Sequence, residues 1–172
     1  MKTFVLDSIN ADGRELRNAF GCFATGVTIV TTRTQAGCPE GLTCNSFSAV
    51  SLDPPLLLWS LRKAAASLAN FRATGHFAVS VLAGGQEEVA SHFARPHPDK
   101  FAGIAHRDGL GGCPLIAGAL ATFECEQAGA HEAGDHIVFF GRVQRAAYGE
   151  GAPLIFSAGQ FQQLASNLLD AT

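Results

Sequence analysis

Short runs of apolar and β-branched residues recur along the chain and predict a series of strands. Residues 27–32 form a β-branched run too short for a helix, and residues 76–82 set Phe77, Val79 and Val81 against smaller side chains in alternation. Further strands are predicted at 42–48, 56–61, 120–127, 136–145 and 153–157. Two of these runs, 42–48 and 56–61, are separated by an Asp-Pro-Pro turn that no helix can cross.

A few segments show helical spacing instead. Asp12 and Glu15 have the spacing of a capping box, and they precede an apolar stripe made of Leu16, Ala19, Phe20, Phe23 and Ala24. Two more helices are predicted at 64–74 and 86–93. The Pro- and Gly-rich stretch at 96–112 predicts a long irregular loop, and the glycines between 128 and 135 predict a wide hairpin.

This order of elements predicts the fold class. The strands are not separated by regular helices, so a doubly wound parallel sheet is not expected. Six or so strands with a few helices instead indicate a mainly β, α+β protein, an antiparallel Greek-key-like barrel with helices packed outside it. The 172 residues are enough for one domain, whose core we expect at about 12–165.

Composition adds an expectation about partners. Charged residues make up 16% of the chain, below the roughly 25% of typical soluble domains, so part of the surface is expected to be buried against a second subunit. The net charge of −3 argues against a nucleic-acid ligand. Asp7 interrupts the first apolar residues, and no apolar stretch is long enough to span a bilayer, so we expect a cytoplasmic protein without a membrane partner.

Several common site motifs are missing. The sequence has neither a dinucleotide-binding GxGxxG after a strand nor a P-loop, and no serine lies in a GxSxG elbow. His131, Glu132 and His136 resemble a zinc helix, but the histidines are five residues apart with Gly134 between them, so no metal is expected. The five cysteines show no CxxC spacing, and buried free thiols are expected.

One segment is more polar than its surroundings. The stretch GLTCNSFSAVSLDPP at 41–55 places several hydroxyl and amide side chains along one strand and turn: Thr43, Asn45, Ser46, Ser48 and Ser51. Such groups, with backbone N–H groups at a strand end, can bind a phosphate or the polar edge of a flavin without a basic patch. A Ser/Thr-rich edge strand with local turn bonds would have the same composition, so both interpretations stay open.

The same segment carries a family resemblance. GLTCNSFSAVSLDPPLLLWSL resembles the signature of the flavin reductase domain of two-component monooxygenases. Five further blocks follow in the family's order and spacing, namely HFAVSVLAGGQEEVASHFA, DKF, GCPLIAGALATFEC, AGDHIVFFGRV and GAPLIFSAGQFQQL. The resemblance covers about 16–164 and implies an FMN-binding split β-barrel that works as a homodimer.

The resemblance also implies an activity and a set of site residues. It implies that NADH or NADPH reduces FMN or FAD, and that the reduced flavin diffuses to a separate flavin-dependent monooxygenase. Flavin contacts are implied for Thr43, Asn45, Ser46 and Ser51, proximity to the flavin phosphate for Ser60, Lys63 and Ser67, closure of the site for Lys100 and Phe101, and contact with the nicotinamide for His136. Alternatively, Lys100 is a solvated surface lysine and His136 a strand-start residue bonded to the backbone.

Four positions depart from the family pattern. Ala64 and Ala66 stand where many relatives have hydroxyl residues, which leaves the choice between FMN and FAD open. Gln160 and Phe161 replace an Arg and a Tyr of the last block, so a preference for NADPH is less expected. Two other functions remain as alternatives: a flavoprotein that keeps its flavin and serves as a carrier or reduces another acceptor, and a barrel without a ligand.

Overall fold

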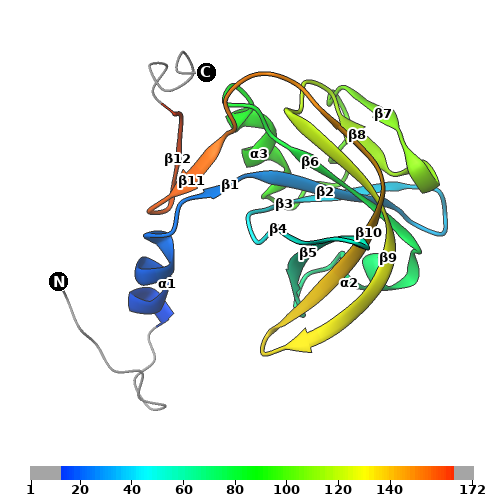
Figure 1. Ribbon diagram of the computed structural model, residues 1–172, viewed down its shortest axis with the longest axis horizontal. Helices are drawn as coiled ribbons and strands as arrows, with labels where there is room; N and C mark the ends of the chain where they lie inside the picture. Colours follow the sequence, from blue (N-terminus) through cyan, green and yellow to red (C-terminus); the bar gives the residue numbers. More distant parts are fainter. Residues whose placement is uncertain (1–12, 165–172) are drawn as a thin grey trace.

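A computed structural model of the protein describes residues 13–164 (Figure 1). The proposed cap Asp12 lies outside these residues. The fold is mainly β, with three α-helices among the described residues: α1 (Gly13–Gly21), α2 (Leu68–Ala73) and α3 (Glu87–Phe93). No helix within 13–164 has the length and hydrophobicity needed to cross a bilayer.

A seven-stranded sheet forms the body of the protein, and every pair of neighbouring strands in it is antiparallel. Its order is β3-β2-β6-β9-β10-β5-β4. Its strands are β2 (Thr28–Arg33), β3 (Pro39–Cys44), β4 (Ser48–Leu52), β5 (Pro55–Arg62), β6 (His76–Val81), β9 (Ala121–Ala133) and β10 (His136–Tyr148). The predicted mainly antiparallel β class is therefore confirmed.

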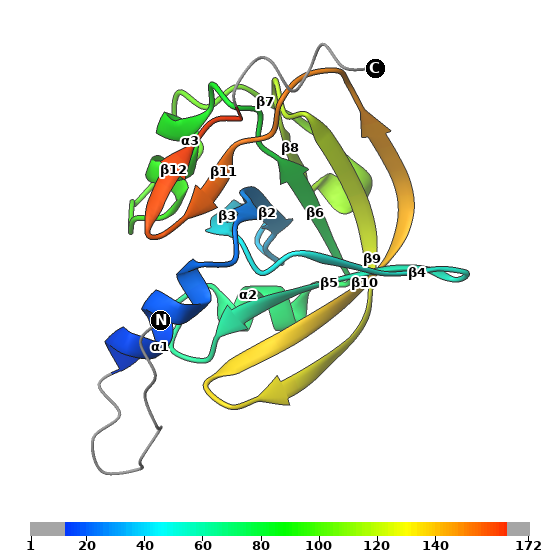
Figure 2. The ribbon, with the colours of Figure 1, turned by 60° about the vertical axis from the view of Figure 1, so that its left-hand side comes forward.

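The sheet curls because its two edge strands follow each other in the chain (Figure 2). Only residues 45–47 separate β3 at one edge from β4 at the other. Ser46 fastens this crossing segment to β5, since its hydroxyl accepts a hydrogen bond from the N–H of Ser60 at 2.8 Å and lies 3.2 Å from the Ser60 carbonyl oxygen. The crossing explains why the strand predicted at 42–48 is two strands in the structure.

Aromatic side chains fill the curled sheet. Trp59 is fully buried, stacks on Phe139 with ring centroids 4.9 Å apart, and meets the edges of Phe71 and Phe77. Phe71 comes from α2, which therefore packs against the core of the sheet. Burial of these large rings stabilises the curled sheet.

A second apolar cluster lies on the other face of β2. Val27 and Ile29 pack there with Phe93 of α3 and with Phe101, whereas Val30 faces the first core. Because β2 is buried on both faces, its β-branched residues show no polar alternation. The cluster holds α3 and the loop after it against the sheet.

The remaining elements are small. A three-stranded sheet has the order β1-β11-β12, and β7 pairs with β8. These elements span β1 (Thr25–Gly26), β7 (His106–Asp108), a 3₁₀ turn η1 (Leu110–Gly112), β8 (Pro114–Ile116), β11 (Ile155–Ser157) and β12 (Gln160–Gln162). No residue of α1 is buried, and Phe20 and Phe23 are 68% and 77% exposed, so the predicted apolar stripe of this helix faces outward.

Several predicted boundaries are wrong. The hairpin expected to be wide is tight, because β9 and β10 continue to a turn at Gly134-Asp135, where Gly134 adopts a φ of 59°. The helix expected at 64–74 is limited to α2, and the loop at 96–112 contains β7 and η1. Cys44, Cys113 and Cys125 are buried free thiols as expected, but Cys22 and Cys38 are exposed.

Candidate flavin site

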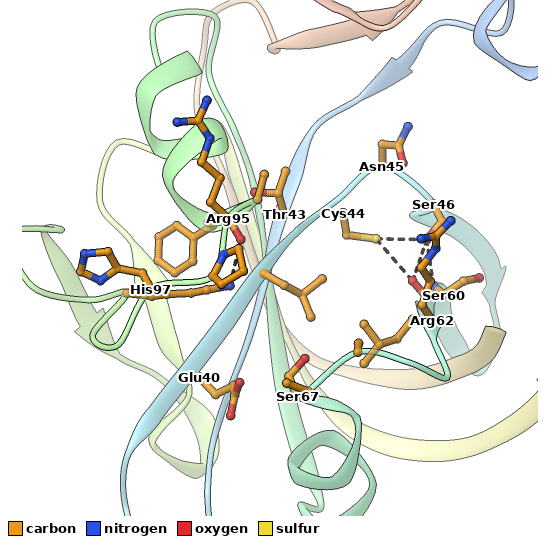
Figure 3. A pocket seen from close by; sticks show the side chains of 18 of the residues that line it. Glu40, Thr43, Cys44, Asn45, Ser46, Ser60, Arg62, Ser67, Arg95 and His97 are labelled. Atoms are coloured by element: carbon orange, nitrogen blue, oxygen red, sulfur yellow. Dashed lines mark hydrogen bonds between the residues drawn. The ribbon is translucent and has the colours of Figure 1, made fainter. Parts of the chain in front are cut away.

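A cavity of about 660 Å³ lies where β3, the crossing segment, the end of β5, the start of α2 and the loop after α3 meet (Figure 3). This volume is within the range of roughly 300–1,000 Å³ that is typical of small-molecule binding pockets. Its polar lining consists of Glu40, Thr43, Cys44, Asn45, Ser46, Ser60, Arg62, Ser67, Arg95, His97, Lys100 and His136. Leu42, Ala65, Ala66 and Phe93 supply apolar surface.

Seven of the ten predicted site residues line this cavity, although they come from distant parts of the chain. They are Thr43, Asn45, Ser46, Ser60, Ser67, Lys100 and His136. Ser51 lies outside it on β4, where its hydroxyl accepts from the N–H of Asp53. Lys63 and Phe101 are also outside the lining, for reasons that their contacts show.

Lys63 belongs to a surface ion-pair cluster. Its ammonium donates to Glu132 of β9 at 3.0 Å, and Arg72 of α2 donates to the other oxygen of the same carboxylate at 3.1 Å. Both hydrogen bonds hold the pKa of Glu132 below its ordinary value. The cluster ties the β9–β10 hairpin to α2 and directs Lys63 away from the cavity.

Phe101 is a core residue behind β3. Its ring meets Phe93 edge to face at a centroid separation of 5.1 Å, and both rings are buried. Phe101 therefore supports the wall of the cavity from behind rather than closing its mouth.

The hydroxyl groups of the polar strand are already bonded to the protein. Thr43 donates to the carbonyl of Ala90 at 2.6 Å, which fixes α3 against β3. Ser46 bridges the backbone of Ser60, and the thiol of Cys44 lies 3.0 Å from the Ser46 hydroxyl. Among the described residues, the Asn45 amide makes no side-chain hydrogen bond, so it is the group of this strand most available to a ligand.

Lys100 is anchored to the backbone of two neighbouring elements, β3 and α3. Its ammonium donates to the carbonyls of Gly41 at 3.1 Å and Phe93 at 3.0 Å. Burial lowers the pKa of Lys100, and the nearby carboxylate of Glu40 partly opposes that shift. The expectation that it is a solvated surface lysine is wrong.

His136 lies at the start of β10, next to an acid. Its Nδ1 is 2.7 Å from the Asp135 carboxylate, and this hydrogen bond lowers the pKa of Asp135. The carboxylate fixes the proton on Nδ1, so Nε2 is the nitrogen left for a ligand. The alternative of a histidine bonded only to backbone is therefore wrong.

The sequence reasoning missed several lining residues. Arg62 and Arg95 add positive charge to the cavity, His97 adds an imidazole, and Glu40 adds a carboxylate that accepts a hydrogen bond from Asn70. Arg62 is the last residue of β5, one residue beyond the strand predicted at 56–61, and alternation along β5 places it on the same face as Ser60. His97 lies in the stretch at 96–112 that the sequence marked only as an irregular loop, and Arg95 immediately precedes that stretch.

This set of groups suits a flavin nucleotide. A flavin has a flat, largely apolar ring with a polar edge, and its tail carries phosphate. Leu42, Ala65 and Ala66 offer apolar surface, and the Asn45 amide offers hydrogen bonds to a polar edge. Arginine side chains on the same cavity suit the phosphate. Among the described residues, no cluster of three metal-ligating side chains occurs.

Comparison with known proteins identifies the family. The model of the flavin reductase like domain matches residues 20–165. The chain belongs to this family. The flavin reductase chain is 46% identical over 150 residues to the FMN reductase (NADH) SmoA of Agrobacterium fabrum, covering 87% of this chain and 85% of that protein. It is 42% identical over 151 residues to the reductase subunit HsaB of a flavin-dependent monooxygenase from Rhodococcus jostii, covering 87% and 77%.

A solved structure agrees with the fold. The NADH:FAD oxidoreductase SgcE6 of Streptomyces globisporus, in complex with NAD and FAD fragments, superposes on the flavin reductase chain with a TM-score of 0.89. The two are 41% identical, and the match covers 99% of this chain and 100% of that one. Three other curated relatives, 45 to 49% identical, are longer, and this chain spans only 42 to 57% of their length.

The family departures lie in two places. Ala66 lines the cavity, so the missing hydroxyl there removes a hydrogen-bonding group from the site, whereas Ala64 is outside the lining. Gln160 and Phe161 lie in β12, where Phe161 packs edge to face on Phe156 with ring centroids 5.5 Å apart. Neither β12 residue reaches the cavity.

Proposed function

We propose that this protein is an NAD(P)H:flavin oxidoreductase that reduces FMN or FAD and releases the reduced flavin to a partner monooxygenase. Membership of the flavin reductase family supports the reaction type. The observation that carries the proposal is the cavity itself, where the Asn45 amide and apolar walls adjoin two arginines and a lysine. A flavin held there would supply the acceptor for a hydride from the reduced nicotinamide, so the chain needs no nucleophile.

The residues of the chain then bind and orient. Asn45 hydrogen-bonds the polar edge of the ring, and Thr43 and Ser46 hold the strand that carries Asn45 in place. His136 contacts the nicotinamide end of the reductant through Nε2, donating when the ring is protonated and accepting when it is neutral. Asp135 keeps the imidazole oriented for either role.

A homodimer is part of the proposal. The outward apolar face of α1 supports it, together with Leu52 of β4, which is 95% exposed. A groove of about 1,000 Å³ between α1 and β11 with the turn that follows it adds surface that a second copy can cover. Size measurement by light scattering should give twice the mass of the 18.0 kDa chain, and a monomer at working concentration would contradict this part.

The setting completes the proposal. Buried free thiols at Cys44, Cys113 and Cys125 fit a reducing cytoplasm. The monooxygenase reductase among the relatives supports a separate oxygenase as the acceptor of reduced flavin.

Steady-state oxidation of NADH and NADPH in the presence of added FMN, FAD or riboflavin tests the activity. Rates that saturate with free flavin support an enzyme that exchanges its flavin. A protein that retains one flavin and does not turn over the added flavin would instead be the fixed-flavin alternative. If the protein neither binds flavin nor turns it over, the proposed function is refuted.

The role of His136 has its own test. Replacing His136 with Ala should raise the KM for NADH about tenfold, the size of one hydrogen bond to a charged group, while the Kd for FMN stays unchanged. His131→Ala is the matched control, because this exposed histidine lies on the neighbouring strand outside the cavity. An unchanged KM in His136→Ala would remove His136 from the reductant site.

A further inference from the structure

The cations around the cavity differ in whether they are already engaged by the protein. Lys63, which the family resemblance places near the flavin phosphate, is bonded to Glu132 and lies outside the cavity lining. Lys100 donates two hydrogen bonds to backbone carbonyls, and its charge is close enough to Glu40 to be stabilised by it. Lys63 therefore points away from the cavity, and Lys100 has one of its three ammonium donors left for a ligand.

Arg62 differs from both lysines. In β5, residues 57, 59 and 61 are buried in the core, so Ser60 and Arg62 point to the opposite face of the strand. Arg62 pairs directly with His136 of β10, and side chains paired in this way share a face. Both side chains line the cavity.

The guanidinium of Arg62 also has unused hydrogen-bonding capacity. Within residues 13–164, its side chain makes no hydrogen bond and no ion pair. Arg62 has a weak electrostatic effect on Asp135, but that carboxylate is hydrogen-bonded to His136. Figure 3 shows Arg62 on the same side of the cavity as Ser46 and Ser60, across β3 from Arg95. An arginine offers up to five donors in a planar fork that matches a phosphate.

Ser67 supports the same wall. It is 9% exposed, lines the cavity, and its hydroxyl does not cap the helix that follows. Within residues 13–164 this hydroxyl makes no hydrogen bond, so it is open to a ligand in the cavity. The wall thus offers a guanidinium at Arg62 together with the hydroxyls of Ser60 and Ser67, whereas Ala65 and Ala66 between them offer no side-chain donor.

We infer that Arg62 is the residue that binds the phosphate of the flavin, in place of Lys63 and Lys100. This inference rests on the proposed function and assigns the charge recognition within that same site. Lys100 is then a positioning residue that joins β3 to α3, and Lys63 belongs to the surface cluster that holds the hairpin. FMN and riboflavin differ only by this phosphate, so they form a direct probe of the assignment.

The experiment is a titration of the purified full chain with FMN and with riboflavin, for the wild type and for Arg62→Gln. In the wild type, FMN should bind about tenfold or more tightly than riboflavin, as expected for a charge-assisted contact. In Arg62→Gln, the FMN affinity should fall to that of riboflavin, and the riboflavin affinity should not change. The unchanged riboflavin affinity also shows that the variant is folded.

Three further variants make the result specific. The preference for FMN is the ratio of the Kd for riboflavin to the Kd for FMN. In Lys63→Gln and Arg95→Gln, the logarithm of this ratio should stay at least half of its wild-type value. Arg142→Gln, an exposed arginine of β10 outside the cavity, is the matched control and should behave as the wild type. Loss of the preference in Lys63→Gln or Arg95→Gln, with Arg62→Gln unaffected, would overturn the inference.

The test separates this inference from the proposed function. A wild type that binds both flavins equally and oxidises NADH would overturn the role of Arg62 while leaving the reductase activity intact. A wild type that binds neither flavin would refute the proposed function itself.

Discussion

Gly41 should be sensitive to the smallest possible side chain, because β3 packs directly against two buried rings at this position. A Cβ added at Gly41 would lie 2.9 Å from Cε1 of Phe93 and 3.1 Å from Cζ of Phe101. Both rings are almost completely buried and contact each other, so neither can move without disturbing the second apolar cluster. The Gly41 carbonyl also accepts the hydrogen bond from Lys100, which couples the packing to the cavity wall.

The expected cost of Gly41→Ala follows from these contacts. Overpacking a buried site costs about 1–3 kcal/mol, while removing a glycine from the unfolded chain returns about 0.4–1 kcal/mol. Gly75→Ala is the matched control, because a Cβ at Gly75 meets nothing within 4 Å and only the gain remains. The difference between the two variants therefore isolates the overpacking, and it corresponds to a Tm about 2–12 °C lower for Gly41→Ala.

Thermal unfolding followed by circular dichroism, with all variants at one protein concentration, measures this difference. A dimer makes the Tm depend on concentration, so the concentration must be held fixed. We also expect weaker FMN binding in Gly41→Ala, since a displaced β3 carries Thr43 and its neighbours with it. A Tm for Gly41→Ala equal to or above that of Gly75→Ala would refute the reasoning.

Two other perturbations separate structural from ligand-binding charges. Lys100→Met should lower the free energy of unfolding by about 1 kcal/mol or more for each of two lost hydrogen bonds, and chemical denaturation will measure it. The preference for FMN over riboflavin should survive this change, and its loss at unchanged stability would mean that Lys100 binds the phosphate. For Glu132, whose pKa lies below its ordinary 4.5, the stabilisation by Lys63 and Arg72 is present above that value and disappears as the pH falls through the lowered pKa. Glu132→Gln should therefore be less stable than the wild type at neutral pH, with the difference vanishing in acid; a constant difference would show that the ion pairs do not contribute.

The sequence predicted the strands best where the local residue pattern is typical of a strand alone. The β-branched run at 27–32 corresponds to β2, and the alternating stretch at 76–82 corresponds to β6. The predictions were poorer where the chain leaves one edge of the sheet and continues at the other edge. No local signal marks residues 45–47 as the link between two edges of one sheet, because that role depends on strands far away in the sequence.

The candidate site shows the same division. The polar segment and the family blocks predicted seven side chains that the structure gathers around one cavity, and the signal for Thr43 and Asn45 was simply their polarity in an apolar strand. Arg62 was missed because an arginine at a strand end is common, and its place beside His136 follows from a pairing between strands far apart in the sequence. Lys63 was chosen by its place in the motif, but Glu132, 69 residues away, engages it.

By itself, the sequence determined the mainly β class, the family and the residue types available for binding a flavin, since these depend on local periodicity and on motifs that can be read in order. The tertiary structure decided which of those groups are free to bind. A hydroxyl or ammonium that donates to a distant carbonyl, as Thr43 and Lys100 do, has fewer donors left for a ligand, and such pairing arises only when the fold brings β3 and α3 together.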